Sequence, residues 1–217
     1  MKWGGLLLLA ALGPAGCGTD NEASVALRMV TSAAKEVITK RGPPAPPVTR
    51  AMLDAYSTPM IMAEIPALKL TTFVVPFAQN GDVETWSTVD DKTISFRQGI
   101  MVATRGFGPD IMQATAPSVA QLASGSGNHD RAYYYLDGAD QTQRFDYHCV
   151  IALTGNETIT IVSEQHLTRH VTETCTGKAG NFVNEYWFEG GTFLRQSRQL
   201  LVQPLGSITF RQVIDNG

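Results

Sequence analysis

The sequence predicts an all-β, mostly antiparallel fold in which a large coiled or sandwich-like sheet forms a partly open barrel beside one N-terminal amphipathic helix. The chain of 217 residues is 43% hydrophobic and 17% charged, which is enough apolar material for one core and too little charge for a disordered chain. Its 20 Gly and 11 Pro are unlike a helical bundle, which is rich in Ala, Glu, Lys and Leu. About a dozen segments also have strand character, and sheets of that size curl or split.

The first 17 residues have the organisation of an export signal. Lys2 precedes an apolar run over 6–12, and small residues precede Cys17, as in secretory signal peptides and in the lipobox of bacterial lipoproteins. The run is shorter than the roughly 20 residues that span a membrane. We expect residues 1–16 to be a lipoprotein signal peptide and Cys17 to carry diacylglyceryl and palmitate chains. Cleavage near Ala15, which leaves a soluble periplasmic protein, is the alternative.

The cysteine count supports this assignment. An unpaired thiol is a liability in an oxidising compartment, and a lipidated Cys17 leaves Cys149 and Cys175 to form one disulfide. Gly18 follows Cys17 in place of the Asp that resembles an inner-membrane retention signal. We therefore expect a lipid-anchored protein on the periplasmic side of the outer membrane.

The mature chain divides by composition. Residues 17–48 are predicted to hold the anchor, an amphipathic helix over 22–40 and a stiff Pro-rich connector over 43–47. Residues 49–217 are predicted to form a single β-rich domain.

Within that domain, Thr49 is predicted to cap a short helix over 50–56, and strands dominate thereafter. Asn80-Gly81 and Gln98-Gly99 are typical of hairpin turns, and Gly155-Asn156 is predicted to be another turn. Residues 105–129 read as a loop with at most one helical turn. The predicted strands are 60–65, 68–78, 83–88, 93–97, 100–104, 133–136, 145–153, 158–164, 166–176, 182–189, 192–202 and 208–213.

The motifs of the common enzyme classes are missing from the sequence, including the Gly-x-Ser-x-Gly elbow, the phosphate loop and the dinucleotide fingerprint. A zinc site can be drawn from His148, Cys149, His166, His170 and Cys175. Exported cysteines are more often bridged, so we expect no metal and no cofactor. A carboxylate pair for glycoside cleavage can be drawn from Glu64, Asp110, Asp137, Asp140 and Glu164, but turn capping explains the turn residues better. We therefore expect a protein that is not an enzyme.

Two aromatic triplets and the charge balance indicate which kinds of partner the chain suits. In Tyr133-Tyr134-Tyr135 and Tyr186-Trp187-Phe188, successive side chains point to opposite faces of a strand, so at least one of each triplet faces outward. Together with Trp86 they are candidates for stacking on sugar rings, although core packing is the commoner use. The 17 basic and 20 acidic residues form no basic run, so we expect no nucleic-acid partner.

An ordered set of short motifs resembles the YjbF-type group 4 capsule polysaccharide lipoprotein family. The set begins with Asn80-Gly81-Asp82-Val83-Glu84-Thr85-Trp86, Gly99-Ile100 and Thr104-Arg105-Gly106-Phe107-Gly108-Pro109-Asp110-Ile111-Met112. It continues with Tyr135-Leu136-Asp137-Gly138, Asp140-Gln141, Tyr147, Cys149, Glu173-x-Cys175, Phe182-x-Asn184-x-Tyr186 and Ser197-x-Gln199. The ordered set is far more specific than any single piece of it.

The resemblance implies an exported, non-enzymatic accessory factor in capsule or exopolysaccharide export or assembly, which binds polysaccharide or an envelope secretion protein. Arg105 is expected to meet an acidic sugar or a partner carboxylate, and the glycines of its segment permit close backbone approach. A structural turn is the competing interpretation of that segment. The candidate binding residues are Arg105, Gly106, Gly108, Asp110, Trp86, Asp137 and Tyr186.

Two other functions remain open from the sequence. A periplasmic hydrolase or lyase that modifies polysaccharide requires a cleft with a carboxylate or histidine pair of perturbed pKa. A carrier of lipid or lipoprotein cargo requires a sizeable apolar cavity.

Overall fold

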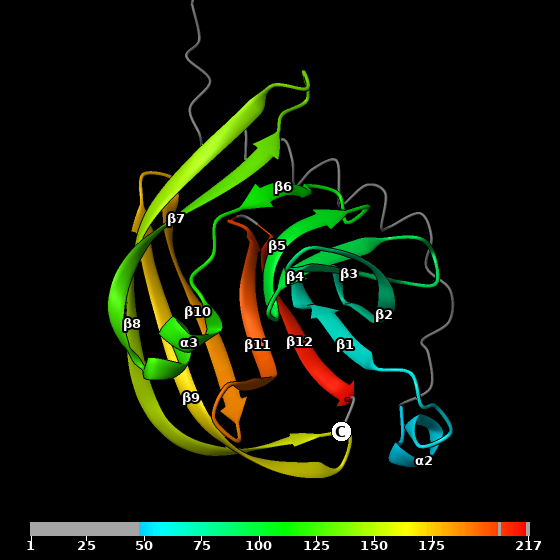
Figure 1. The fold of residues 1–217 in the computed structure, drawn as a ribbon. Coiled ribbons are helices and arrows are strands. Elements are labelled where there is room, and N and C mark those ends of the chain that lie inside the picture. Colours follow the sequence, from blue (N-terminus) through cyan, green and yellow to red (C-terminus); the bar gives the residue numbers. More distant parts are fainter. Residues whose placement is uncertain (1–47, 204, 216–217) are drawn as a thin grey trace, which may run out of the picture.

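The computed structural model describes residues 48–203 and 205–215, and these residues build one 12-stranded antiparallel sheet that curves into a nearly closed barrel (Figure 1). The predicted signal peptide, anchor, amphipathic helix and Pro-rich connector lie outside the described residues. In chain order the elements are α2 Arg50–Leu53, β1 Met60–Ile65, η1 Pro66–Leu68, β2 Leu70–Asn80, β3 Val83–Ser87, β4 Thr93–Arg97, β5 Ile100–Arg105, β6 Ile111–Ala114, α3 Val119–Ser124, β7 Ser126–Leu136, β8 Thr142–Ile161, β9 Glu164–Gly177, β10 Gly180–Glu189, β11 Phe193–Val202 and β12 Gly206–Ile214. The predicted all-β barrel is confirmed.

The barrel is an up-and-down meander. Each strand pairs with its neighbours in sequence, β1 pairs with β12, and the ladder is interrupted at one seam, between β5 and β6. Because successive strands alternate in direction, α3 and the β4–β5, β8–β9 and β10–β11 turns lie at one end, which we call the α3 end. The β5–β6, β7–β8 and β9–β10 turns lie at the other end, which we call the seam end.

Two of the predicted hairpins form as expected. Gly81, Gln98 and Gly99 have φ values of 60°, 51° and 81°, as the tight turns between β2 and β3 and between β4 and β5 require. The Thr49 hydroxyl accepts a hydrogen bond from the Met52 amide at 3.3 Å, so the predicted cap is present. The helix that it begins ends at Leu53 rather than at residue 56.

The predicted loop over 105–129 was wrong in part. It contains β6, the helix α3 and the start of β7. Ser118 caps α3 at its start, and Gly125 ends it with φ 75°, so the Ser/Gly-rich stretch holds a helix end followed at once by a strand.

The predicted turn at Gly155-Asn156 was also wrong. Gly155 lies inside the 20-residue strand β8, at a bulge where the register with β9 shifts after Leu153. The turn comes at Val162-Ser163, whose φ values of 45° and 73° are unusual for residues other than glycine. A bulge and a turn both use glycine, so composition does not tell them apart.

The core lies on both sides of the sheet. Inward-facing side chains fill the barrel, with Ile65, Val74, Ile94 and Ile208 at most 1% exposed. The long β8–β9 hairpin curls past the α3 end toward α2, where a smaller outer cluster forms (Figure 1). Its buried members are Leu53, Ile159, Ile161, Trp187 and Val213. None of the described helices is long and apolar enough to cross a membrane.

Candidate functional site

The glycine-rich segment that follows β5 is organised around the Asp110 carboxylate. That carboxylate accepts hydrogen bonds from the Thr104 hydroxyl at 3.0 Å, from the Gly106 amide at 2.7 Å and from the Phe107 amide at 3.1 Å. The Phe107 side chain is 4% exposed and belongs to the barrel core. The segment is therefore a self-contained turn that one carboxylate holds together.

The same turn closes the seam of the barrel. The Ile111 amide donates to the Thr104 hydroxyl at 2.9 Å, and the Arg105 guanidinium donates to the carbonyl oxygens of Thr104 and Ile111 at 2.5 and 2.9 Å. Gly106 and Gly108 have φ values of 86° and 104°, which favour glycine. These contacts assign a structural role to the segment, while its predicted role in binding stays a prediction.

Asp137 lies at the seam end as well, in the turn between β7 and β8. Its carboxylate accepts hydrogen bonds from the amides of Ala139 and Gln141, both at 2.9 Å, and from the Gln143 side chain at 3.0 Å. The turn follows β7, and β7 pairs with β6, which is the strand that borders the seam. The candidates Arg105, Asp110 and Asp137 thus share one end of the barrel.

Tyr186 belongs to a buried polar cluster in the barrel interior. The Glu173 carboxylate accepts hydrogen bonds from Arg131, Asn184 and Tyr186, each at 2.8 Å, and contacts His129 Nε2 at 2.7 Å. The side chains of Arg131 and Glu173 are both 0% exposed. They come from β7, β9 and β10, whose pairing places them on the same inner face.

The cluster holds Glu173 in its charged form. Burial by itself raises the pKa of that carboxyl, but the Arg131 charge and the hydrogen bonds from its neighbours outweigh burial and lower the pKa to about 2. The pKa of Arg131 is raised, because the attraction of Glu173 outweighs burial. Burial chiefly raises the pKa of Tyr186 well above its usual value, so this hydroxyl remains a donor. The cluster is a stable internal ion pair.

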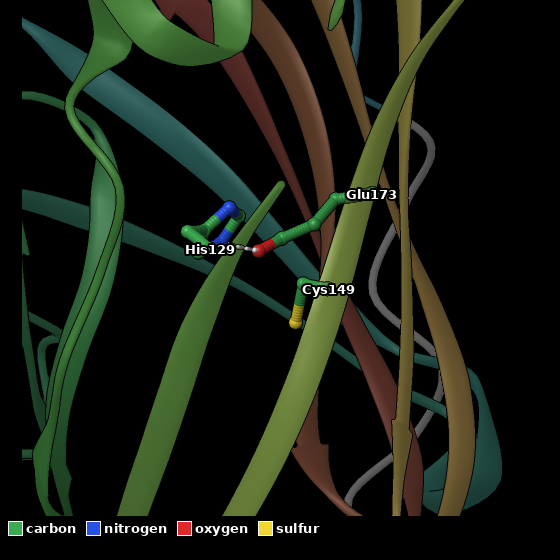
Figure 2. Close-up of side chains that lie close together, drawn as sticks. All are labelled: His129, Cys149 and Glu173. Carbon is green, nitrogen blue, oxygen red and sulfur yellow. Dashed lines mark hydrogen bonds and ion pairs between the residues drawn. The ribbon is translucent and has the colours of Figure 1, made fainter. Parts of the chain in front are cut away.

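A disulfide between Cys149 and Cys175 lies beside this cluster and joins β8 to β9, as the cysteine count predicts. Figure 2 shows Cys149 near His129 and Glu173, and one potential ligand atom of each lies within 4.8 Å of the others. A thiolate is the form of cysteine that binds metals, and the bridge occupies this sulfur. The trio therefore does not offer a metal its third ligand while the disulfide is intact.

The zinc ligands drawn from the sequence do not come together. His148 lies on the outer face, with its side chain 57% exposed and paired with Asp130 at 2.9 Å. His170 stacks on Trp187 with 4.4 Å between ring centroids, and His166 contacts Glu189 at 3.2 Å. Both histidines belong to contacts at the outer cluster rather than to the disulfide.

Sequence reasoning did not single out the ionic cluster as a site. Glu173, Asn184 and Tyr186 appeared among the motifs of the resemblance, but spacing alone gave no reason to join them. One signal could have pointed to Arg131: it stands two positions before Tyr133, so in a strand its charged side chain shares the inward face with that ring.

An open hollow lies at the α3 end of the barrel. Its outer part has a volume of about 420 Å³ and lies between α3, the β4–β5 turn and the start of β11. The Gln199 side chain holds the β4–β5 turn in place, because it accepts from the Met101 amide at 2.9 Å and donates to the Gly99 carbonyl at 3.2 Å. Arg169 donates to the Ala123 carbonyl at 2.8 Å and so fixes the end of α3. The lining residues are Gln98, Gly99, Val119, Ala120, Thr192, Phe193, Leu194 and Gln212.

A smaller inner part, of about 70 Å³, adjoins the outer part and shares Gly99, Leu194 and Gln212 with it. Trp86, a candidate binding residue, lines this inner part and donates from Nε1 to Glu84 at 3.4 Å. The hollow is thus at the opposite end of the barrel from the candidates at the seam end. The predicted binding residues divide among the seam end, the sealed cluster and the hollow.

Comparisons with known proteins agree with the motifs and with the fold. The family model described as "Group 4 capsule polysaccharide lipoprotein gfcB, YjbF" matches residues 31–213. The crystal structure of the hypothetical lipoprotein YmcC from Escherichia coli (K12) is similar with a TM-score of 0.69 and 15% identity, over 78% of this chain and 90% of that chain. At that identity the similarity shows a shared fold. The comparison with curated proteins gave no match.

Proposed function

Because the chain belongs to the group 4 capsule polysaccharide lipoprotein family, we propose that it is a non-enzymatic accessory factor in capsule or exopolysaccharide export or assembly. In this role it binds polysaccharide or an envelope secretion protein without turning it over. Family membership supports an exported, envelope-associated protein with a capsule-related role.

One observation favours binding over catalysis. Among the described residues, Glu173 is the carboxylate with the most perturbed pKa, and it contacts a histidine, as an acid–base pair would. Its side chain is 0% exposed and is saturated by donors, so it cannot reach a substrate. The hollow at the α3 end, in contrast, is open and has the size of a ligand site.

A binding and turnover measurement tests the proposal. The full chain, purified from its native membranes in detergent, is incubated with exopolysaccharide from the same cells and with an envelope extract. We expect retention of polysaccharide or of a secretion protein, with no new reducing ends and no change in polysaccharide length. New chain ends would refute a non-enzymatic role, and retention of neither material would refute accessory binding.

We propose that Cys17 anchors the protein to the outer membrane. Two acyl chains are needed for durable attachment, which a lipidated Cys17 provides. The intact mass of the native protein, measured before and after reduction and alkylation, should show acylation and alkylation at two sites only after reduction. An unmodified Cys17 would make the protein a soluble periplasmic one and would refute the anchor.

A further inference from the structure

We infer that the hollow at the α3 end binds a neutral carbohydrate segment, with a sugar ring against Phe193 and a small apolar substituent, such as the methyl of an acetamido group, in the inner part. The inference rests on the proposed function, because it names the ligand class and the site of the proposed binding. It places that site at the end of the barrel opposite to the glycine-rich turn.

The lining of the outer part selects against charge. Gln98, Thr192 and Gln212 supply amide and hydroxyl groups there, and no charged side chain lines it among the described residues. A ligand charge would lose water without gaining a counterion. Amides and hydroxyls both donate and accept hydrogen bonds, as sugar hydroxyls do. A neutral, hydroxyl-rich ligand therefore fits this lining best.

Phe193 provides a fixed aromatic surface at the hollow. Its side chain is 41% exposed, and the Arg195 guanidinium lies 4.5 Å from the ring centroid. Arg195 is itself held by Glu189 at 2.5 Å and by Asp215 at 2.6 Å. The ring thus rests on an immobilised, charge-compensated group and remains partly open to solvent. A flat apolar surface of this kind suits the carbon–hydrogen face of a sugar ring.

The inner part limits what enters beyond the ring. Its volume of about 70 Å³ is about half that of an engineered cavity of roughly 150 Å³ that binds benzene, so it has room for a small group only. Trp86, Phe96 and Phe210 supply aromatic walls, with the two phenylalanine rings edge to face at 4.9 Å. The two charged side chains that line it, Glu84 and Arg195, have opposite signs. A neutral methyl-bearing substituent meets these limits.

Three trisaccharides test the ligand class by calorimetric titration of the full chain in detergent. One is built only from N-acetylglucosamine, the second only from glucose and the third only from galacturonic acid. We expect the acetylated trisaccharide to bind at least about tenfold more tightly than the glucose trisaccharide, because a pocket for one apolar group discriminates by that order. We expect no binding of the acidic trisaccharide. Equal or tighter binding of the acidic sugar would overturn the assignment of a neutral ligand.

Two matched pairs of variants test the location. Ala120→Trp fills the hollow from an exposed position of α3, and Ala51→Trp places the same bulk on an exposed position of α2. Phe193→Ala removes the aromatic surface, and Phe77→Ala removes a 70% exposed ring outside the hollow. We expect Ala120→Trp to abolish binding and Phe193→Ala to weaken it about 2- to 12-fold, while both control variants bind as the natural protein does.

Failure of this inference is distinguishable from failure of the proposed function. If Ala120→Trp and Phe193→Ala retain the native exopolysaccharide as their controls do, the hollow is not the site, although accessory binding stands. If the unaltered chain retains neither polysaccharide nor an envelope protein, both proposals are overturned. Loss of exopolysaccharide retention in Ala120→Trp, but not in Ala51→Trp, supports both.

Discussion

Replacement of Arg131 by methionine removes the counterion of a fully buried carboxylate while keeping a long side chain in the barrel. Lowering of the Glu173 pKa from 4.5 to about 2 corresponds to about 3 kcal/mol of stability at neutral pH. In other proteins, removal of one partner from a buried ion pair lowers the free energy of unfolding by about 3–5 kcal/mol, because the remaining charge is buried without a counterion. We therefore expect Arg131→Met to lower the free energy of unfolding at pH 7 by at least about 3 kcal/mol.

In the Arg131→Met variant, the contribution of Glu173 to stability should also change with pH in the opposite direction. In the natural protein the pKa of Glu173 is lower in the folded state than in the unfolded state. The contribution of Glu173 to the free energy of unfolding is therefore complete above about pH 4.5 and is lost as the pH falls toward 2. Without Arg131, burial raises the pKa of this carboxyl above its unfolded value. The contribution of Glu173 to stability then increases as the pH falls and is lost as the pH rises.

Urea unfolding of the full chain, followed by tryptophan fluorescence with the disulfide intact, measures both effects. Arg144→Met is the matched control, because Arg144 lies on the neighbouring strand β8 with its side chain 58% exposed. We expect this control to unfold as the natural protein does. An Arg131→Met variant within about 1 kcal/mol of the natural protein at pH 7, or one with unchanged pH dependence, would refute the reasoning.

Three further predictions follow from local geometry. Gly177→Ala should lower the free energy of unfolding by more than about 2 kcal/mol, because the added Cβ would lie 2.5 Å from a backbone oxygen of β8. Gly138→Ala is the control, since its added Cβ would meet nothing within 4 Å, and it should change that free energy by less than about 0.5 kcal/mol in the same urea assay. Asp110→Ala should cost about 2 kcal/mol, since it removes the acceptor of three hydrogen bonds at the seam, and an unchanged melting temperature would contradict that role. Reduction of Cys149–Cys175 should lower stability by about 3 kcal/mol, and coincident unfolding curves for the reduced and oxidised chains would contradict this expectation.

The sequence went furthest where the signal is local. Alternating polarity and two-residue turns predicted β1 and β4 with their observed bounds, and most other strands to within a few residues. The Thr49 cap and the pairing of Cys149 with Cys175 also followed from local chemistry and from counting. Errors arose at Gly155 and in the loop over 105–129, where glycine serves a bulge and a helix end as readily as a turn.

The candidate binding residues show why the site was harder to predict than the fold. All of them belong to the ordered motifs of the family resemblance, but the meander places Asp137 at the seam end, Tyr186 inside the barrel and Trp86 in the wall of the hollow. The hollow itself combines short pieces of α3, the β4–β5 turn, β11 and β12. No local pattern marks such a set, because its members meet only after the sheet curves.

By itself, the sequence determined most of the strands, the family and the disulfide pairing, because each depends on periodicity, ordered motifs or a count. Only the tertiary structure decided which residues are sealed and which are open. Arg131 on β7 and Glu173 on β9 face inward from the two strands that flank β8, and closure of the barrel buries them as an ion pair. Closure likewise leaves Phe193 beside an open hollow that is lined by α3, the β4–β5 turn and β12. These outcomes depend on contacts between strands far apart in the chain, which sequence spacing does not encode.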